Sequence, residues 1–158
     1  MSMKITDRLK AEHGVFLGQL DHLQDLVRRE ASLEVLEAVA ETIASVEERH
    51  ARVEDRVLYP ALAGVMGGKS PVLQRWRAAH DELRQLVARM RSGGFDESTV
   101  DAFAERLRDH MEREIHDVFA LAEEVLSEER LTEMSSWEVD HIREVNARRR
   151  DRTERGRG

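Results

Sequence analysis

Hydrophobic residues recur every three or four positions along most of the chain, with charged residues between them. This spacing is typical of amphipathic helices, and the alternating pattern of a β-strand is essentially absent. Cap-forming residues, glycines and prolines divide the pattern into helices. We expect helices over residues 6–30, 32–63, 70–91, 96–126 and 127–146.

The second of these helices is expected to be irregular near its end. Pro60 has no backbone N–H, and its ring clashes with the preceding helical turn. We therefore predict a kink, or an end of regular helix, at residues 55–59.

Composition supports an all-α helix bundle with charged outer faces. Of the 158 residues, 36% are charged, 41% are hydrophobic and only 4% are aromatic. Residues 1–126 are expected to form the main domain. Residues 127–158 are expected to form a short helical extension and a disordered, arginine-rich tail that begins near Arg148.

Several classes of protein are disfavoured by the sequence. It has no apolar run near the roughly 20 residues that span a membrane and no signal-peptide segment at its start, so we expect a cytoplasmic protein without membrane partners. The net charge of −7 argues against nucleic-acid binding by the main domain. Because cysteine is absent, a bound metal would need nitrogen and oxygen ligands.

Two His-x-x-x-Glu pairs are the strongest chemical signal. His50 with Glu54, and His110 with Glu114, lie four residues apart and therefore on one face of a helix, flanked by apolar residues. A single such pair would more simply be part of a solvated, charged face. Two pairs in equivalent positions indicate a metal site that faces the core.

Two further histidines strengthen this interpretation. His13 and His80 lie in apolar stripes of the first and third helices, at heights that match those of His50 and His110 in antiparallel neighbours. Four imidazoles and two carboxylates that face one core are costly unless something binds them. The repeated order, a lone histidine followed by His-x-x-x-Glu, is what a dinuclear centre requires.

The residues Glu12-His13, His50-x-x-x-Glu54-x-x-x-Leu58-Tyr59-Pro60, Ala79-His80 and His110-x-x-x-Glu114 resemble the hemerythrin-like HHE cation-binding domain family over about residues 6–126. The resemblance implies an up-down-up-down four-helix bundle around two non-haem iron ions in an oxo- or hydroxo-bridged di-iron centre. It also implies that Glu54 and Glu114 bridge the irons, and that the four histidines are terminal ligands.

Two departures from the oxygen carriers of this family bear on function. Arg84 stands where those proteins have another histidine. On the last helix those proteins have an aspartate five residues after the histidine, whereas here Glu114 follows His110 by four. The chain is instead similar to iron–sulfur cluster repair proteins and to iron- and oxygen-sensing members. This implies a reaction with, or sensing of, O₂, peroxide or nitric oxide in a stress response, rather than O₂ transport. Enzyme, sensor and iron store all stay open, as does a homodimer.

Two alternatives remain. A ferritin-like di-iron oxidase would use Glu-x-x-His on two helices; Glu47-x-x-His50 matches, but Leu107 occupies the equivalent position before His110. From another class, the chain could be a metal-free helical interaction module.

The other candidate residues have simpler explanations. His22 and His116 fall on the opposite sides of their helices and are expected at the surface. His141 could be a ligand only if the fifth helix folds over the site. Tyr59 and Trp76 are expected to line the core or a pocket, and the phenol of Tyr59 could donate a hydrogen bond to a bound oxygen species.

Overall fold

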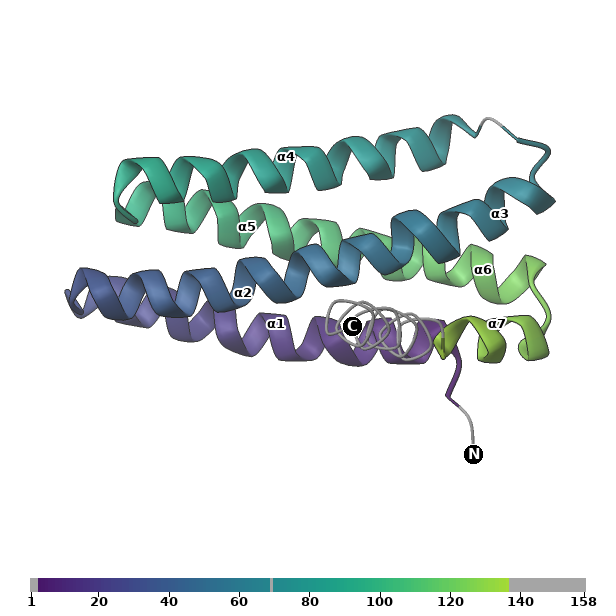
Figure 1. The fold of residues 1–158 in the computed structure, drawn as a ribbon, viewed down its shortest axis with the longest axis horizontal. Coiled ribbons are helices and arrows are strands. Elements are labelled where there is room, and N and C mark those ends of the chain that lie inside the picture. The colour runs from purple at the N-terminus through teal and green to yellow at the C-terminus, as the bar shows by residue number, and fades with distance from the viewer. Residues whose placement is uncertain (1–2, 69, 137–158) are drawn as a thin grey trace, which may run out of the picture.

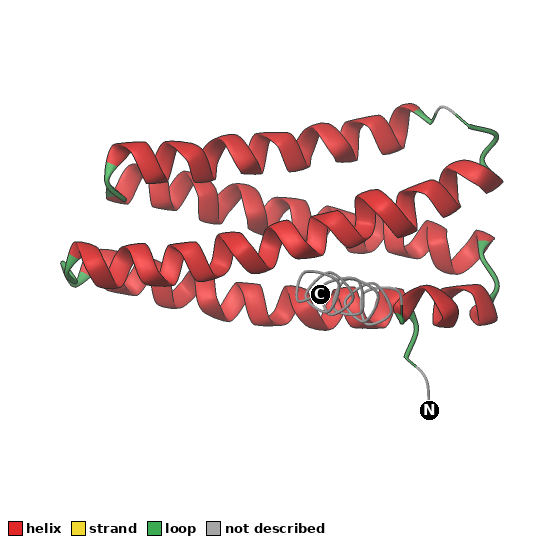
Figure 2. Cartoon of the chain, in the orientation of Figure 1, coloured by secondary structure: helices red, strands yellow, loops and turns green. Residues whose placement is uncertain are grey.

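A computed structural model describes residues 3–68 and 70–136 of the chain, and these form four long helical arms and one short helix (Figure 1). No strand occurs in these two ranges, which confirms the expected all-α class (Figure 2). The first arm is α1 (Ile5–Arg28), and the third is α4 (Pro71–Gly93). The second arm comprises α2 (Leu33–Val53), η1 (Glu54–Leu58) and α3 (Tyr59–Val65); the fourth comprises α5 (Glu97–Glu114), η2 (Ile115–Phe119) and α6 (Ala120–Val125).

The four arms pack as an antiparallel bundle with up-down-up-down order. Helix α1 contacts α2 and α5, and α4 also contacts α2 and α5 (Figure 1). The second and fourth arms also meet where α3 contacts α6. The short helix α7 (Glu128–Ser135) packs on α1 and α6. The expected continuation of this helix to residue 146, His141 and the arginine-rich tail lie outside the described residues. None of the described helices is long and apolar enough to cross a bilayer.

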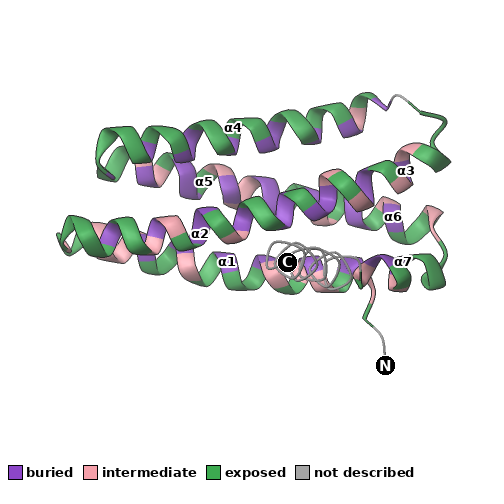
Figure 3. Ribbon diagram, viewed as in Figure 1, coloured by how far each residue is buried: buried purple, intermediate pink, exposed green. Residues whose placement is uncertain are grey.

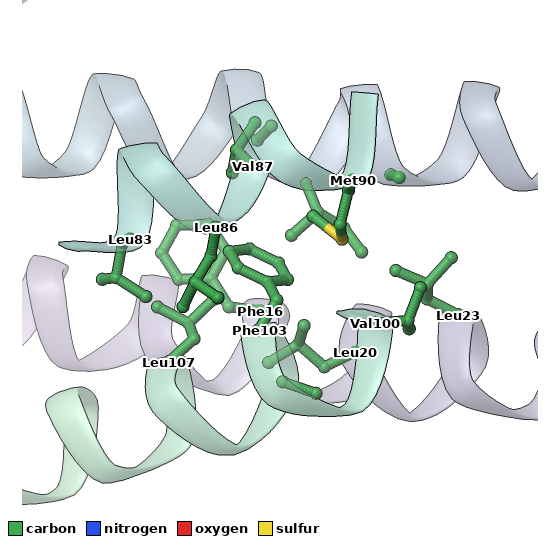
Figure 4. Packing of buried hydrophobic residues seen from close by; sticks show 14 of the residues in the cluster. Phe16, Leu20, Leu23, Leu83, Leu86, Val87, Met90, Val100, Phe103 and Leu107 are labelled. Carbon is green, nitrogen blue, oxygen red and sulfur yellow. The ribbon is translucent and has the colours of Figure 1, made fainter. Parts of the chain in front are cut away.

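The buried residues lie mainly on the sides of the helices that face one another (Figure 3). The hydrophobic residues among them form two clusters. The turn-end cluster lies toward the α1–α2 and α4–α5 turns, and ten of its side chains are labelled in Figure 4. The loop-end cluster lies toward α3, α6 and α7. The turn-end cluster is built around Phe16, Leu20, Leu23, Ile43, Leu83, Met90, Val100, Phe103 and Leu107, and the loop-end cluster around Ile5, Leu9, Leu58, Tyr59, Leu62, Trp76, Phe119, Leu131 and Met134.

The helix ends differ in part from the expected boundaries. Asp96 caps α5 by accepting a hydrogen bond from the backbone N–H of Thr99, and Gly94 ends α4 in a left-handed conformation with φ of 82°. Ser32, the residue before α2, makes no such side-chain bond. Helix α1 begins at Ile5, one residue before the expected start, and the side chain of Thr6 is buried.

The predicted irregularity in the second arm is confirmed and has a counterpart that the sequence did not suggest. Residues Glu54–Leu58 form a π-helical turn, which the backbone N–H of Tyr59 closes on the carbonyl of Glu54. A second π-helical turn spans Ile115–Phe119, in an arm that contains no proline. Each π turn begins at, or directly after, the glutamate of a His-x-x-x-Glu pair. Proline is therefore not the feature that the two turns share, and such turns are frequent at functional sites.

Replacing Pro60 by alanine tests whether the proline causes the first π turn. We expect the turn at residues 54–58 to persist, because the equivalent turn at residues 115–119 forms without a proline. A crystal structure of the variant provides the measurement. Regular α-helical hydrogen bonding through residues 54–58 in the variant would show that Pro60 alone imposes the turn.

Candidate metal centre

A layer of polar side chains lies between the two hydrophobic clusters. Helices α1, α2, α4 and α5 each contribute one histidine, and the two glutamates lie where α2 and α5 meet the π turns. All six side chains are at most 4% exposed. The layer consists of His13, His50, Glu54, His80, His110 and Glu114, the same six residues that the sequence singled out.

These six residues form two overlapping groups of possible ligand atoms. We call the space beside His13 and His50 the first position, and the space beside His80 and His110 the second position. Glu54 and Glu114 belong to both groups, and within each group the candidate ligand atoms all lie within 4.8 Å of one another. The pairing of heights that the sequence predicted is thus present in the structure.

The donor atoms converge on the space between the four arms. At the first position, His13 Nε2 lies 3.0 Å from His50 Nε2. Glu54 spans both positions, since its Oε1 lies 2.9 Å from His50 Nε2 and its Oε2 lies 3.1 Å from His80 Nε2. Glu114 reaches both with one oxygen: its Oε2 lies 3.5 Å from His13 Nε2 and 3.6 Å from His110 Nε2.

Several of these atoms have no hydrogen-bond partner within the described part of the chain. They are both carboxylate oxygens of Glu54, Oε2 of Glu114 and Nε2 of His80. The contacts of Glu54 with His50 and His80 are short, but the geometry does not direct an N–H at the carboxylate. A buried polar atom without a partner costs about 1–3 kcal/mol. Imidazole nitrogens and carboxylate oxygens that converge in this way suit two transition-metal cations that share carboxylates.

Two of the histidines contact a carboxylate through Nδ1, the ring nitrogen on the side away from the two positions, which we call the outer nitrogen. Each carboxylate comes from a neighbouring arm or turn. His50 Nδ1 lies 2.7 Å from Glu12 Oε2, and His80 Nδ1 lies 3.2 Å from Asp55 Oδ1. A proton on Nδ1 fixes the tautomer that leaves Nε2 free to bind a metal. The Nδ1 atoms of His13 and His110 are buried without a partner among the described residues. Each position therefore combines one supported and one unsupported histidine.

Burial and neighbouring charge divide the four histidines into two electrostatic classes. Burial, aided by the nearby charge of His50, lowers the pKa of His13 to about 4, and burial lowers the pKa of His110 to about 3. Burial also opposes charging of His50 and His80. At His50 the carboxylates of Glu54 and Glu12 outweigh burial and raise the pKa to about 10. At His80 the carboxylates of Asp55 and Glu54 do the same, and the pKa again rises to about 10. A cation that binds Nε2 of either histidine would therefore compete with a proton.

The two glutamates are electrostatically unlike. The neighbouring His50 and His80 outweigh the effect of burial and hold the pKa of Glu54 well below its usual range. Burial, together with the charge of Glu54, raises the pKa of Glu114 well above its usual range. Tyr59 donates a hydrogen bond of 2.7 Å to Glu114 Oε1, which leaves Oε2 to face the two positions. The phenol that the sequence placed near the site thus contacts a glutamate.

Aromatic rings enclose the polar layer. At the first position, the ring of Phe16 lies edge-on to His50 at 5.2 Å, and Phe119 lies 5.4 Å from the ring of His13. At the second position, Tyr59 stacks on His80 at 5.7 Å, and the edge of Trp76 meets His110 at 5.3 Å. Tyr59 is buried in the core and Trp76 lines a pocket, as expected for both residues.

Some features of the site were not predicted. Glu12 and Asp55 were missed as partners of the histidines, although each directly adjoins a predicted ligand in the sequence. Arg84 directs its guanidinium to Asp81 and Asp55, with a side chain that is 42% exposed, and not into the site. Glu47 is buried, which raises its pKa to about 7, but it belongs to neither group of candidate ligand atoms. As predicted, His22 and His116 are exposed.

Comparison with known proteins agrees with this geometry. No individual curated protein and no solved structure matches the chain. Residues 4–122 match the family model of the hemerythrin HHE cation-binding domain. This range contains all six clustered residues and both π turns. The chain therefore belongs to the hemerythrin family of HHE cation-binding domains.

Proposed function

We propose that this protein binds two non-haem iron ions and reacts with, or senses, O₂, peroxide or nitric oxide. The observation that carries the proposal is that two sets of nitrogen and oxygen donors share both buried glutamates. His13 and His50 would hold one ion, His80 and His110 the other, and Glu54 and Glu114 would bridge them. Bound iron would supply electrons and open coordination sites for a small ligand.

The surrounding residues would orient and protect this ligand set. Glu12 and Asp55 hold the outer nitrogens of His50 and His80, so both Nε2 atoms point inward. Tyr59 fixes the rotation of the Glu114 carboxylate through its hydrogen bond to Oε1. Because these contacts come from the fold, they would keep the donors aimed at the two positions before any ion arrives.

A surface pocket supports approach of a small ligand to the second position. The pocket has a volume of about 410 Å³ and lies between α4 and α5. The ring of Trp76 and the imidazole of His110 form part of its wall, although His110 is only 3% exposed. The remaining lining residues are Arg75, Ala78, Ala79, Glu82, Arg106, Arg113 and Asp117.

The donor set favours reaction or sensing over reversible O₂ transport. Each position has two imidazoles and two shared carboxylates within reach, so neither would be filled by protein ligands alone. Arg84, at the place where oxygen carriers of this family have a histidine, pairs with Asp55 and Asp81 outside the ligand layer. An exogenous ligand therefore has room to bind iron.

The alternatives have less support. A ferritin-like oxidase would use Glu47 as a ligand, but Glu47 lies outside both groups, and Leu107 is part of the turn-end cluster. A metal-free interaction module would have to retain six buried polar side chains in its core with several unpaired atoms. Such atoms are costly without a ligand.

Alanine substitutions at the histidines test the ligand set. His50→Ala and His110→Ala each remove one donor, and we expect both to lower the iron content per chain and the melting temperature of the iron-loaded protein, because an ion that binds only the folded state stabilises it. Elemental analysis and thermal unfolding, with and without iron, provide the measurement.

His22→Ala and His116→Ala are the matched controls, since both side chains lie at the surface. They should leave iron content unchanged. Full iron content in both His50→Ala and His110→Ala would show that the assigned ligands are wrong.

The reaction with O₂ distinguishes redox chemistry from transport. When the reduced, iron-loaded protein is mixed with O₂ in a stopped-flow spectrometer, we expect oxidation that purging with argon does not reverse. Added peroxide or nitric oxide, together with a reductant, should then be consumed. An oxygenated form that releases O₂ under argon would instead establish reversible binding.

A further inference from the structure

A chain of hydrogen bonds runs from α7 to the first position. Arg8, on α1, donates from Nη1 to the backbone carbonyl of Ser135 over 3.0 Å and from Nε to Glu12 Oε1 over 3.0 Å. The other oxygen of Glu12 lies 2.7 Å from His50 Nδ1. One guanidinium thus contacts both the end of α7 and the carboxylate that supports a candidate ligand.

We propose that Arg8 is a positioning residue for His50, acting through Glu12, and that it couples docking of α7 to metal binding at the first position. The inference rests on the proposed function, because it requires a cation beside His13 and His50. It adds a role for α7 that the ligand set alone does not imply.

The geometry of Arg8 suits this role. A guanidinium is planar and carries its N–H donors in a fixed fork, so the direction of one hydrogen bond constrains the direction of the other. Ser135 is the last residue of α7, and carbonyl groups at a helix end lack intrahelical partners and carry partial negative charge. The side chains of Arg8 and Glu12 are only 20% and 22% exposed, which limits screening by water.

Helix α7 depends on its contacts with the bundle. It has eight residues, and isolated helices shorter than about 12 residues are marginal in water. Leu131 and Met134 are buried in the loop-end cluster with Ile5 and Leu9 of α1. The hydrogen bond from Arg8 to Ser135 therefore lies beside the apolar contact that holds α7 on α1.

The second position has a similar support that does not reach α7. Asp55 contacts His80 Nδ1, and Arg84 donates to Asp55 Oδ2 over 3.4 Å. Arg84 also donates to Asp81 of its own helix, over 2.8 Å. Arg84 therefore provides a matched control. It donates a hydrogen bond to Asp55, the carboxylate that supports His80 at the second position, and makes no hydrogen bond with α7 within the described residues.

Coupling between two sites is reciprocal. If docked α7 holds Arg8 and Glu12 where they orient His50, docking of α7 raises the affinity of the first position for metal by some factor. A metal bound at the first position must then favour docked α7 by that same factor. Loss of an outer partner of a ligating histidine typically weakens metal binding about 10–100-fold. Metal loading should therefore protect the backbone amides of α7, and disturbing α7 should weaken metal binding.

The experiment measures hydrogen exchange of residues 128–135 in full-length protein, without metal and after anaerobic loading with iron(II). In the wild type we expect loading to slow exchange in α7 several-fold. In Arg8→Ala and Arg8→Lys this metal-dependent slowing should be lost, whereas Arg84→Ala should retain it. Iron content and affinity are measured on the same samples, and circular dichroism verifies that each variant is folded.

A second measurement, of iron affinity, uses Leu131→Ala. This substitution weakens the docking of α7 and leaves the Arg8 side chain unchanged. This change should lower affinity for one of two irons in the wild type, but not further in the Arg8→Ala background. Two bound irons without any response of α7, or an equal response in wild type and Arg8→Ala, would overturn the coupling and leave the proposed function standing. A wild-type protein that takes up no iron would overturn both.

Discussion

Six buried polar side chains that face one another across the bundle axis are the constraint on which the rest of the structure depends. Histidine and glutamate are expensive to bury, and several of their atoms, including both carboxylate oxygens of Glu54, make no hydrogen bond within the described residues. The polar layer is held in place by a hydrophobic cluster on either side. The bundle therefore holds rigidly a set of donors that could bind metal ions.

The two positions have equivalent donors but different surroundings. The first is enclosed by Phe16 and Phe119 and is linked through Glu12 to α1 and α7. The second lies beside Trp76 and the pocket between α4 and α5. Within the function proposed above, a small ligand would therefore approach the second position from this pocket.

The sequence predicted the bundle and the six clustered residues because both depend on helical periodicity alone. On a regular helix the residue number determines the direction of a side chain, so the heights of His13 and His50 could be matched by counting. The partners Glu12 and Asp55 were missed because their contacts depend on how neighbouring helices are rotated. The second π turn was missed because its sequence has no signal comparable to Pro60.

Anomalous diffraction at the iron absorption edge, from crystals of the iron-loaded protein, tests the central claim most directly. The account predicts two peaks in the polar layer, one between His13 and His50 and one between His80 and His110, with the carboxylates of Glu54 and Glu114 touching both. A single peak, or peaks away from these two glutamates, would contradict it.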